Sequence, residues 1–288
     1  MSDKKILENI KKLREITGVG FSDCKLAITE NNGDIEKSVE YLRKKGIAKA
    51  SKKMSRVAAE GLALLSEKSG NVSAIEINSE TDFVAKNKDF ISFCKEVSEI
   101  NFQNKSNLDL LKSSKMKNGK SVEENLIALI SKIGEKITIR RSKYFNNNGL
   151  NFTYVHNSSE KNIGKVIAIV QLTKSSKKDL KEIGGKLAMH VAAQAPIAID
   201  ENGIKKEVLD KELEIIKEEL KNSGKKADMI EKIANGKIKK FISDNTLLNQ
   251  VWIMDTKMKV NQVIKQHSDK EEIKVLDFVR FKVGEGVD

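Results

Sequence analysis

An internal repeat constrains the fold of this 288-residue chain more than any other feature of its sequence. The stretch 164–169 (GKVIAI) echoes the stretch 70–75 (GNVSAI), and the same offset persists into the helical patterns that follow. In those helices, three apolar positions of the first copy recur in the second: Phe93, Cys94 and Val97 match Leu187, Ala188 and Val191. Repeated supersecondary units of this kind indicate a duplicated strand-hairpin-helix core. We therefore predict an α+β fold.

Local signals place several elements of this core. Residues 62–65 and 72–78, joined by a turn over 68–71, are predicted to form a hairpin. Asn87 is a plausible N-cap for the helix that follows, and Ser121 with Glu124 has the pattern of a capping box at the start of a later helix. A further helix is expected around Val260 to His267.

The segments around the repeat suggest further parts. Asp34 is a good N-cap for a third N-terminal helix, and Gly46 is predicted to end that helix. Leu209, Leu213, Ile216 and Leu220 have the spacing of a coiled-coil seam. We predict a three-helix docking unit over 1–46, a basic linker over 47–59, a first core repeat over 60–143, the first part of a second repeat over 144–204, an inserted antiparallel helical hairpin over 205–242, and a C-terminal helix with the closing strand over 243–288.

The joint between the first repeat's strand and helix has an unusual composition. Strand-to-helix joints usually carry small polar residues, yet Phe83 and Val84 stand here directly after an acid. One interpretation is that both fold back onto the core as the first helical turn. The repeat argues otherwise, because the corresponding stretch 175–178 (SSKK) is polar, so the unit does not need an apolar pair. We expect Phe83 to have a role outside the core, while the core interpretation stays open.

The formal net charge of +12 points to a nucleic acid or an acidic protein as partner. The basic excess is concentrated in residues 1–56, and no acid occurs between Tyr41 and Ala59. Aromatic residues that could stack on bases are missing from that stretch, which weakens a single-strand-binding interpretation. The longest apolar runs are too short to cross a bilayer and the start lacks a signal-peptide apolar region, so we expect a cytoplasmic protein.

Catalytic motifs are missing from the sequence. It has no glycine-rich phosphate loop, no metal-ligand cluster and no nucleophile motif, and its histidines (His156, His190 and His267) are far apart. His190, in an apolar helical pattern, is expected to be a core or interface residue. Cys24 and Cys94 are expected to be free buried thiols. We therefore favour a binding protein over an enzyme, with no cofactor and no metal site.

Several motifs, taken together, resemble one family across nearly the whole chain. They are Leu13-Arg14 through Thr17-Gly18, Asp23-Cys24-Lys25, Asn32-Gly33-Asp34-Ile35, Thr81-Asp82-Phe83-Val84-Ala85-Lys86, Met189-His190-Val191-Ala192-Ala193 and Val283-Gly284-Glu285-Gly286. The chain thereby resembles bacterial elongation factor Ts, the nucleotide-exchange factor for the translational GTPase elongation factor Tu. The resemblance implies an N-terminal domain like ubiquitin-associated domains, a duplicated α+β core and an inserted helical hairpin.

The resemblance also implies roles for individual residues. Asp82 and Phe83 would enter the GTPase beside its nucleotide-bound Mg²⁺, with Thr81 and Val84 shaping the tip. Further partner contacts would come from Phe21, Lys25 and His156. Two departures from the family pattern stand out: Phe21-Ser22 replaces a usual pair of methionines, and Gln250-Val251-Trp252 stands where Gln-Pro-Phe is common. The partner that the resemblance implies is elongation factor Tu, and no direct contact with nucleic acid or a membrane is expected. The alternative function is a basic RNA- or ribosome-binding protein, which rests on charge alone.

Overall fold

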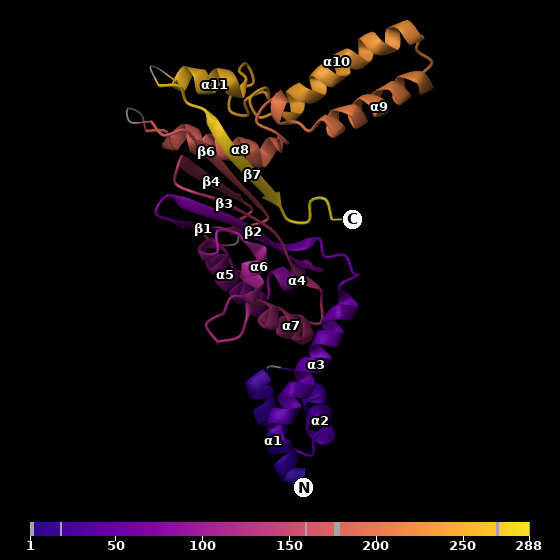
Figure 1. The fold of residues 1–288 in the computed structure, drawn as a ribbon, viewed down its shortest axis with the longest axis vertical. Helices are drawn as coiled ribbons and strands as arrows, with labels where there is room; N and C mark the ends of the chain where they lie inside the picture. The colour runs from indigo at the N-terminus through magenta and orange to yellow at the C-terminus, as the bar shows by residue number, and fades with distance from the viewer. Residues whose placement is uncertain (1–2, 18, 159, 176–178, 269–270, 288) are drawn as a thin grey trace.

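The computed structural model describes residues 3–17, 19–158, 160–175, 179–268 and 271–287. These residues form a mixed α+β structure with N-terminal helices and two antiparallel sheets. Figure 1 shows the N-terminal helices at one end of the molecule, the sheets in the middle and a projecting helical hairpin at the other end.

The N-terminal helices are α1 (Asp3–Thr17), α2 (Phe21–Glu30) and α3 (Ile35–Lys53). They pack around a small core of their own that includes Leu13, Cys24 and Ile28. Asp34 caps α3 as predicted, because its side chain accepts a hydrogen bond of 3.0 Å from the Lys37 backbone N–H.

The prediction that this helix ends at Gly46 is wrong. Helix α3 runs through Gly46 to Lys53, so most of the predicted linker 47–59 is helical. The reason is tertiary packing, which outweighs the low helix propensity of glycine. Gly46 lies against helix α7 (Val122–Ile133), where an added Cβ would be 3.5 Å from the Ser131 hydroxyl, and Ala50 is buried in the main core.

Three basic residues in and next to this segment form contacts within the chain. Arg43 pairs with Glu124 at 2.7 Å near the start of α7, and the Lys53 amine donates to the Gly134 carbonyl at its end. Arg56 pairs with Glu80 at 3.3 Å. The first two contacts attach α3 to the two ends of α7, and the third attaches the segment after α3 to the end of β2. The basic run thus connects the N-terminal helices to the rest of the structure.

The first sheet has the strand order β3-β2-β1-β5, and all its pairs are antiparallel. The predicted hairpin is confirmed, with Leu62 opposite Ile77 and a tight turn at Ser69 and Gly70, both at positive φ. Its strands are β1 (Glu60–Lys68), β2 (Asn71–Ser79), β3 (Ile137–Phe145) and β5 (Ile163–Gly164). Its helical neighbours are α4 (Asp82–Ala85), α5 (Lys88–Gln103), α6 (Leu108–Ser113) and α7. The predicted capping box of α7, Ser121 with Glu124, is present.

The second sheet has the order β4-β6-β7 and is also antiparallel. Helices α8 and α11 pack against it, and their apolar residues share one cluster with Ala168, Val170 and Leu172 of β6. The elements are β4 (Leu150–His156), β6 (Val166–Leu172), α8 (Lys181–Gln194), α11 (Val260–His267) and β7 (Val275–Lys282).

The two sheets pack face to face and the helices cover their outer faces. Strand alternation explains the layers, because successive side chains point to opposite faces. In β1, Leu62 and Leu64 join the cluster under α5, whereas Ala63 and Leu65 join a cluster that also contains Ile167 of β6.

The predicted helical hairpin consists of α9 (Lys206–Asn222) and α10 (Ala227–Asn245), preceded by a 3₁₀ turn over Glu201–Gly203. Ile216 and Leu220 of α9 pack on Ile230 and Ala234 of α10. The hairpin projects away from the sheets in Figure 1.

Candidate functional site

The turn between β2 and α5 consists of the one-turn helix α4 with the residues on either side of it. Strand β2 ends at Ser79, α4 begins at Asp82, and Asn87 starts α5 by accepting hydrogen bonds from the Asp89 and Phe90 backbone N–H groups. The predicted N-cap at Asn87 is therefore confirmed. The turn lies at the margin of the first sheet, on the side of α3 (Figure 1).

Phe83 and Val84 point in opposite directions from this turn. The exposed fraction of Phe83 is 79%, the highest among the exposed large apolar residues in the described part of the chain, whereas that of Val84 is 5%. Val84 packs with Ala85 into the cluster under α5. The interpretation that both residues fold back onto the core is therefore right for Val84 and wrong for Phe83. In the second repeat, residues 176–178 of the corresponding stretch lie outside the described residues.

Asp82, beside Phe83, carries a negative charge held by Lys86. The two side chains form an i,i+4 ion pair of 2.8 Å, in which the Lys86 side chain is 74% exposed and that of Asp82 is 47% exposed. The hydrogen bond from Lys86 lowers the pKa of Asp82, with a smaller contribution from the charge of Lys165, and the pKa of Lys86 is raised in return. Asp82 is therefore ionised at neutral pH. Because exposed ion pairs are weak, its carboxylate remains available to another molecule.

The loop that joins α7 to β3 forms hydrogen bonds with the turn. Thr81 donates two hydrogen bonds to the Glu135 carboxylate, one of 3.0 Å from its backbone N–H and one of 2.8 Å from its hydroxyl. The neighbouring Glu80 accepts from the Lys136 backbone N–H. Glu135 could not be identified from the sequence, because nothing in the local pattern brings residue 135 to residue 81.

The remaining predicted site residues lie in two other places. Phe21 and Lys25 are exposed one helical turn apart on α2, at the far end of α3 from the turn. His156 is exposed at the end of β4, where its ring accepts from or donates to the Tyr154 hydroxyl at 3.2 Å. Its carbonyl accepts from the backbone N–H of Lys165, the residue whose charge also acts on Asp82. The structure thus brings His156 and Asp82 to the same side of the sheets, and it leaves Phe21 and Lys25 apart.

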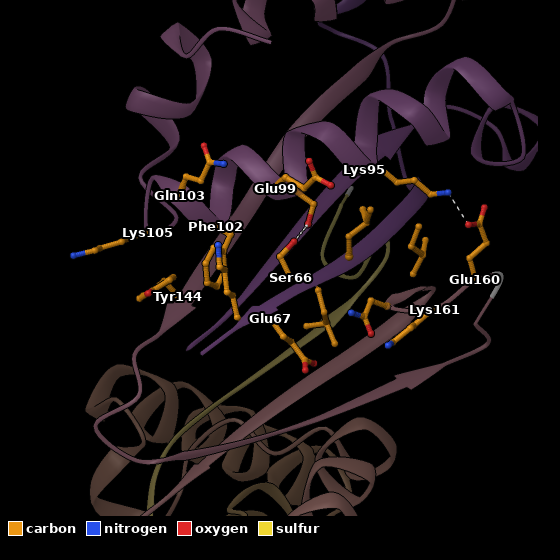
Figure 2. Close-up of a pocket in the computed structure, with 16 residues that line it drawn as sticks. Ser66, Glu67, Lys95, Glu99, Phe102, Gln103, Lys105, Tyr144, Glu160 and Lys161 are labelled. Carbon is orange, nitrogen blue, oxygen red and sulfur yellow. Dashed lines mark hydrogen bonds and ion pairs between the residues drawn. The ribbon is translucent and has the colours of Figure 1, made fainter. Parts of the chain in front are cut away.

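A pocket of about 710 Å³ lies between α5 and the edge of β1 (Figure 2). Lysines and glutamates both line it, and several of these polar groups are satisfied within the chain. Lys95 pairs with Glu160 at 2.6 Å across the pocket, and Ser66 hydrogen-bonds Ser98 at 2.8 Å beneath it. This mixture of charges does not suggest a particular ligand.

Other kinds of site are not found in the described residues. That part of the chain contains no group of three His, Cys, Asp or Glu residues able to hold a metal ion, and no helix of it could cross a membrane. His190 is buried as predicted, bonded to Gln250 at 3.0 Å and stacked on Trp252, and burial lowers its pKa. Cys24 and Cys94 are free and buried, also as predicted.

Comparison with known proteins gives a consistent result along the chain. A family model described as "Elongation factor TS" matches residues 80–285, which begin in the turn between β2 and α5 and end within the C-terminal motif. The chain is 39% identical to "Elongation factor Ts" of Rickettsia akari over 284 residues, covering 97% of this chain and 92% of the relative. The protein of the same name from Xanthobacter autotrophicus is 41% identical over 285 residues, and that from Gluconobacter oxydans is 37% identical over 281 residues. Each match also covers 97% of this chain and 92% of the relative.

Proposed function

The chain belongs to the elongation factor Ts family, and from this premise we propose that its Thr81–Val84 turn enters the GTPase and disturbs the Mg²⁺ that holds GDP. Members of the family are nucleotide-exchange factors for elongation factor Tu in translation elongation. The protein is accordingly an exchange factor that acts by binding, without enzymatic chemistry of its own, and it works in the cytoplasm.

The observation that carries the proposal is the orientation of Phe83. A phenylalanine that is 79% exposed gains no core packing, although its neighbours Val84 and Ala85 are buried. Exposed apolar side chains of this size often mark interaction sites. Here Val84 supports the turn from beneath, Thr81 holds its start, and Phe83 with Asp82 forms the tip offered to the partner.

The physical basis is the strictness of Mg²⁺ coordination. Mg²⁺ requires near-ideal octahedral geometry, so a side chain that shifts the segment holding its ligands lowers the affinity for the bound nucleotide. The coupling is reciprocal, so bound nucleotide must lower the affinity of the exchange factor for the GTPase by the same factor. Rebinding of GTP then releases the factor, which needs neither a nucleotide site nor a catalytic base.

We propose that Phe21, Lys25 and His156 hold other faces of the partner. Phe21 is 45% exposed on the small N-terminal unit, and Lys25 follows one turn later on the same helix. His156 lies on the same side of the sheets as Asp82. These positions support several separated contacts on one large GTPase, with helix α3 setting the distance between them.

The finer fold assignment is also a proposal. The order hairpin, helix, third strand occurs twice, as β1-β2-α5-β3 and as β4-β6-α8-β7, and in both cases the third strand pairs with the second. This agreement supports a duplicated core over 60–143 and 144–204, closed by 243–288 and interrupted by the hairpin at 205–242. The compact helices within 1–46 support a docking domain like ubiquitin-associated domains.

Substitution of Phe83 tests the proposed function. Phe83→Ala should slow GDP release from elongation factor Tu markedly, measured by stopped flow with a fluorescent GDP. The stability of the variant alone should change by less than about 1 kcal/mol, because the side chain is exposed. Phe90→Ala is the matched control: Phe90 is fully buried in α5, so its truncation should cost about 3–5 kcal/mol. A Phe83→Ala variant that is strongly destabilised yet releases GDP normally when folded would refute the proposal.

A further inference from the structure

The exposed turn cannot hold its own conformation. Helix α4 has only four residues, and a single helical turn is unstable alone. Thr81 occupies its N-cap position, but its side chain makes no capping hydrogen bond to the helix. The Thr81 hydroxyl turns to Glu135 instead, 2.8 Å away. The conformation that exposes Phe83 therefore depends on residues outside the turn.

Both oxygens of the Glu135 carboxylate are used in this contact. Oε2 accepts from the Thr81 backbone N–H at 3.0 Å and Oε1 accepts from the hydroxyl. Hydrogen bonds to an ionised group are stronger than neutral ones, and two of them also fix the direction of the chain. We propose that Glu135 is a positioning residue for nucleotide exchange, which sets the direction of Phe83 through Thr81. This inference rests on the proposed function of Phe83.

A second contact beside the first makes the attachment rigid. Glu80 accepts from the Lys136 backbone N–H, so two consecutive residues of the turn bind two consecutive residues of the α7–β3 loop. The Lys136 amine in turn donates to the carbonyls of Met54 and Arg56 at 2.7 Å each. The loop thus connects the turn to the end of α3. On the other side, Val84 is buried, so Phe83 is the large side chain left free at the tip.

A positioning role changes the rate of exchange more than the affinity. If the turn is loosened, only a fraction of the bound complexes presents Phe83 in the productive direction, and the observed rate falls with that fraction. Loss of charge-assisted hydrogen bonds should lower the maximal rate of GDP release by about 10-fold. Contacts made by the N-terminal helices and by His156 are untouched, so the concentration of factor giving half-maximal rate should change by less than about 3-fold.

The test compares Glu135 variants in two backgrounds. Glu135→Ala should lower the maximal release rate about 10-fold in the natural chain but less than about 2-fold in Phe83→Ala, since a residue acting through Phe83 has no effect once Phe83 is gone. Glu135→Gln should keep an intermediate rate, because its amide can accept from the Thr81 N–H and donate to the hydroxyl. Glu99→Ala, in the C-terminal half of α5, is the control and should release GDP at the natural rate.

Each outcome decides the inference. Equal losses in both backgrounds, or a natural rate for Glu135→Ala, would overturn it. A Gln variant as slow as the Ala variant would show that the two hydrogen bonds glutamine can still make to Thr81 do not position the turn, and would also overturn it. If Phe83→Ala itself releases GDP normally, the proposed function fails; if only Glu135→Ala does, the positioning role fails alone. If Glu135→Ala does not fold, Thr81→Val takes its place, because it removes only the hydroxyl hydrogen bond to Glu135. Thr81→Val should lower the rate when Phe83 is present and leave it unchanged in Phe83→Ala.

Discussion

Substitution of Glu76 by glutamine should reveal how strongly one buried carboxylate joins β2, β3 and the C-terminal tail. Glu76 is fully buried on β2, and a β-bulge next to it brings two consecutive arginines of β3 within its reach. Oε1 accepts from Arg140 at 3.1 Å, from the Gly284 backbone N–H at 2.9 Å and from Asn78 at 3.0 Å. Oε2 accepts from the Arg141 guanidinium.

The expected loss follows from these contacts. Glutamine keeps the shape and one acceptor oxygen, but its NH₂ group would face the Arg141 N–H, so two donors would oppose each other. Breaking a buried ion pair by removing one partner costs about 3–5 kcal/mol. The arginine side chains are 23% and 31% exposed and retain some water, which favours the lower end, about 3 kcal/mol.

The pH dependence gives a second signature. Burial raises the pKa of Glu76, but the hydrogen bonds from Gly284, Arg141 and Asn78 outweigh it, so the pKa lies below its ordinary value. A depressed carboxyl pKa contributes stability that is present above the unfolded-state pKa of about 4.3 and is lost as the pH falls through the folded-state value. The stability difference between the natural chain and Glu76→Gln should therefore be constant near neutrality and shrink in acid.

Urea unfolding of the two chains at a series of pH values measures both effects. Asp277→Asn is the matched control, because Asp277 pairs with Lys143 at 2.8 Å between β7 and β3, with both side chains 44% exposed. Its loss should cost less than about 1 kcal/mol. If Glu76→Gln is no more destabilising than Asp277→Asn, or if its deficit persists unchanged in acid, the buried network does not stabilise the fold as argued.

Three further results are expected. Gly284→Ala should lower the melting temperature by several degrees, because φ is +78° and an added Cβ would lie 2.0 Å from the Ala59 carbonyl oxygen; an unchanged melting temperature would contradict this. The unsubstituted chain should lose stability as the pH falls below about 6.5, because burial depresses the His190 pKa and protonation then favours the unfolded chain. His190→Phe should abolish this loss, and parallel pH profiles of the two chains in urea unfolding would argue against it. Deleting residues 1–56 should weaken binding to elongation factor Tu in titration calorimetry. It should also destabilise the remaining chain, because Ala50 no longer packs into the main core and α3 no longer covers α7, while unfolding stays a single transition.

The local elements of the fold could be predicted from the sequence. Asp34, Asn87 and Ser121 were all identifiable as helix caps, because a capping side chain acts on backbone groups two or three residues away. The β1–β2 hairpin followed from alternating apolar residues and a turn at Gly70, and the C-terminal helix begins at Val260 as expected. The repeat and the turn motif also pointed to Phe83 as a residue outside the core.

Tertiary structure decided the features that depend on residues far apart in the chain. Gly46 continues a helix because α7 packs against it, although glycine locally favours an end. Phe83 and Val84 are both apolar, and only the position of the core beneath α4 determines which one is buried. Glu135 meets Thr81 because the strands β2 and β3 are neighbours in the sheet, with their ends at the same margin. Sequence patterns report interactions within a few residues, whereas these contacts exist only after distant segments have packed together.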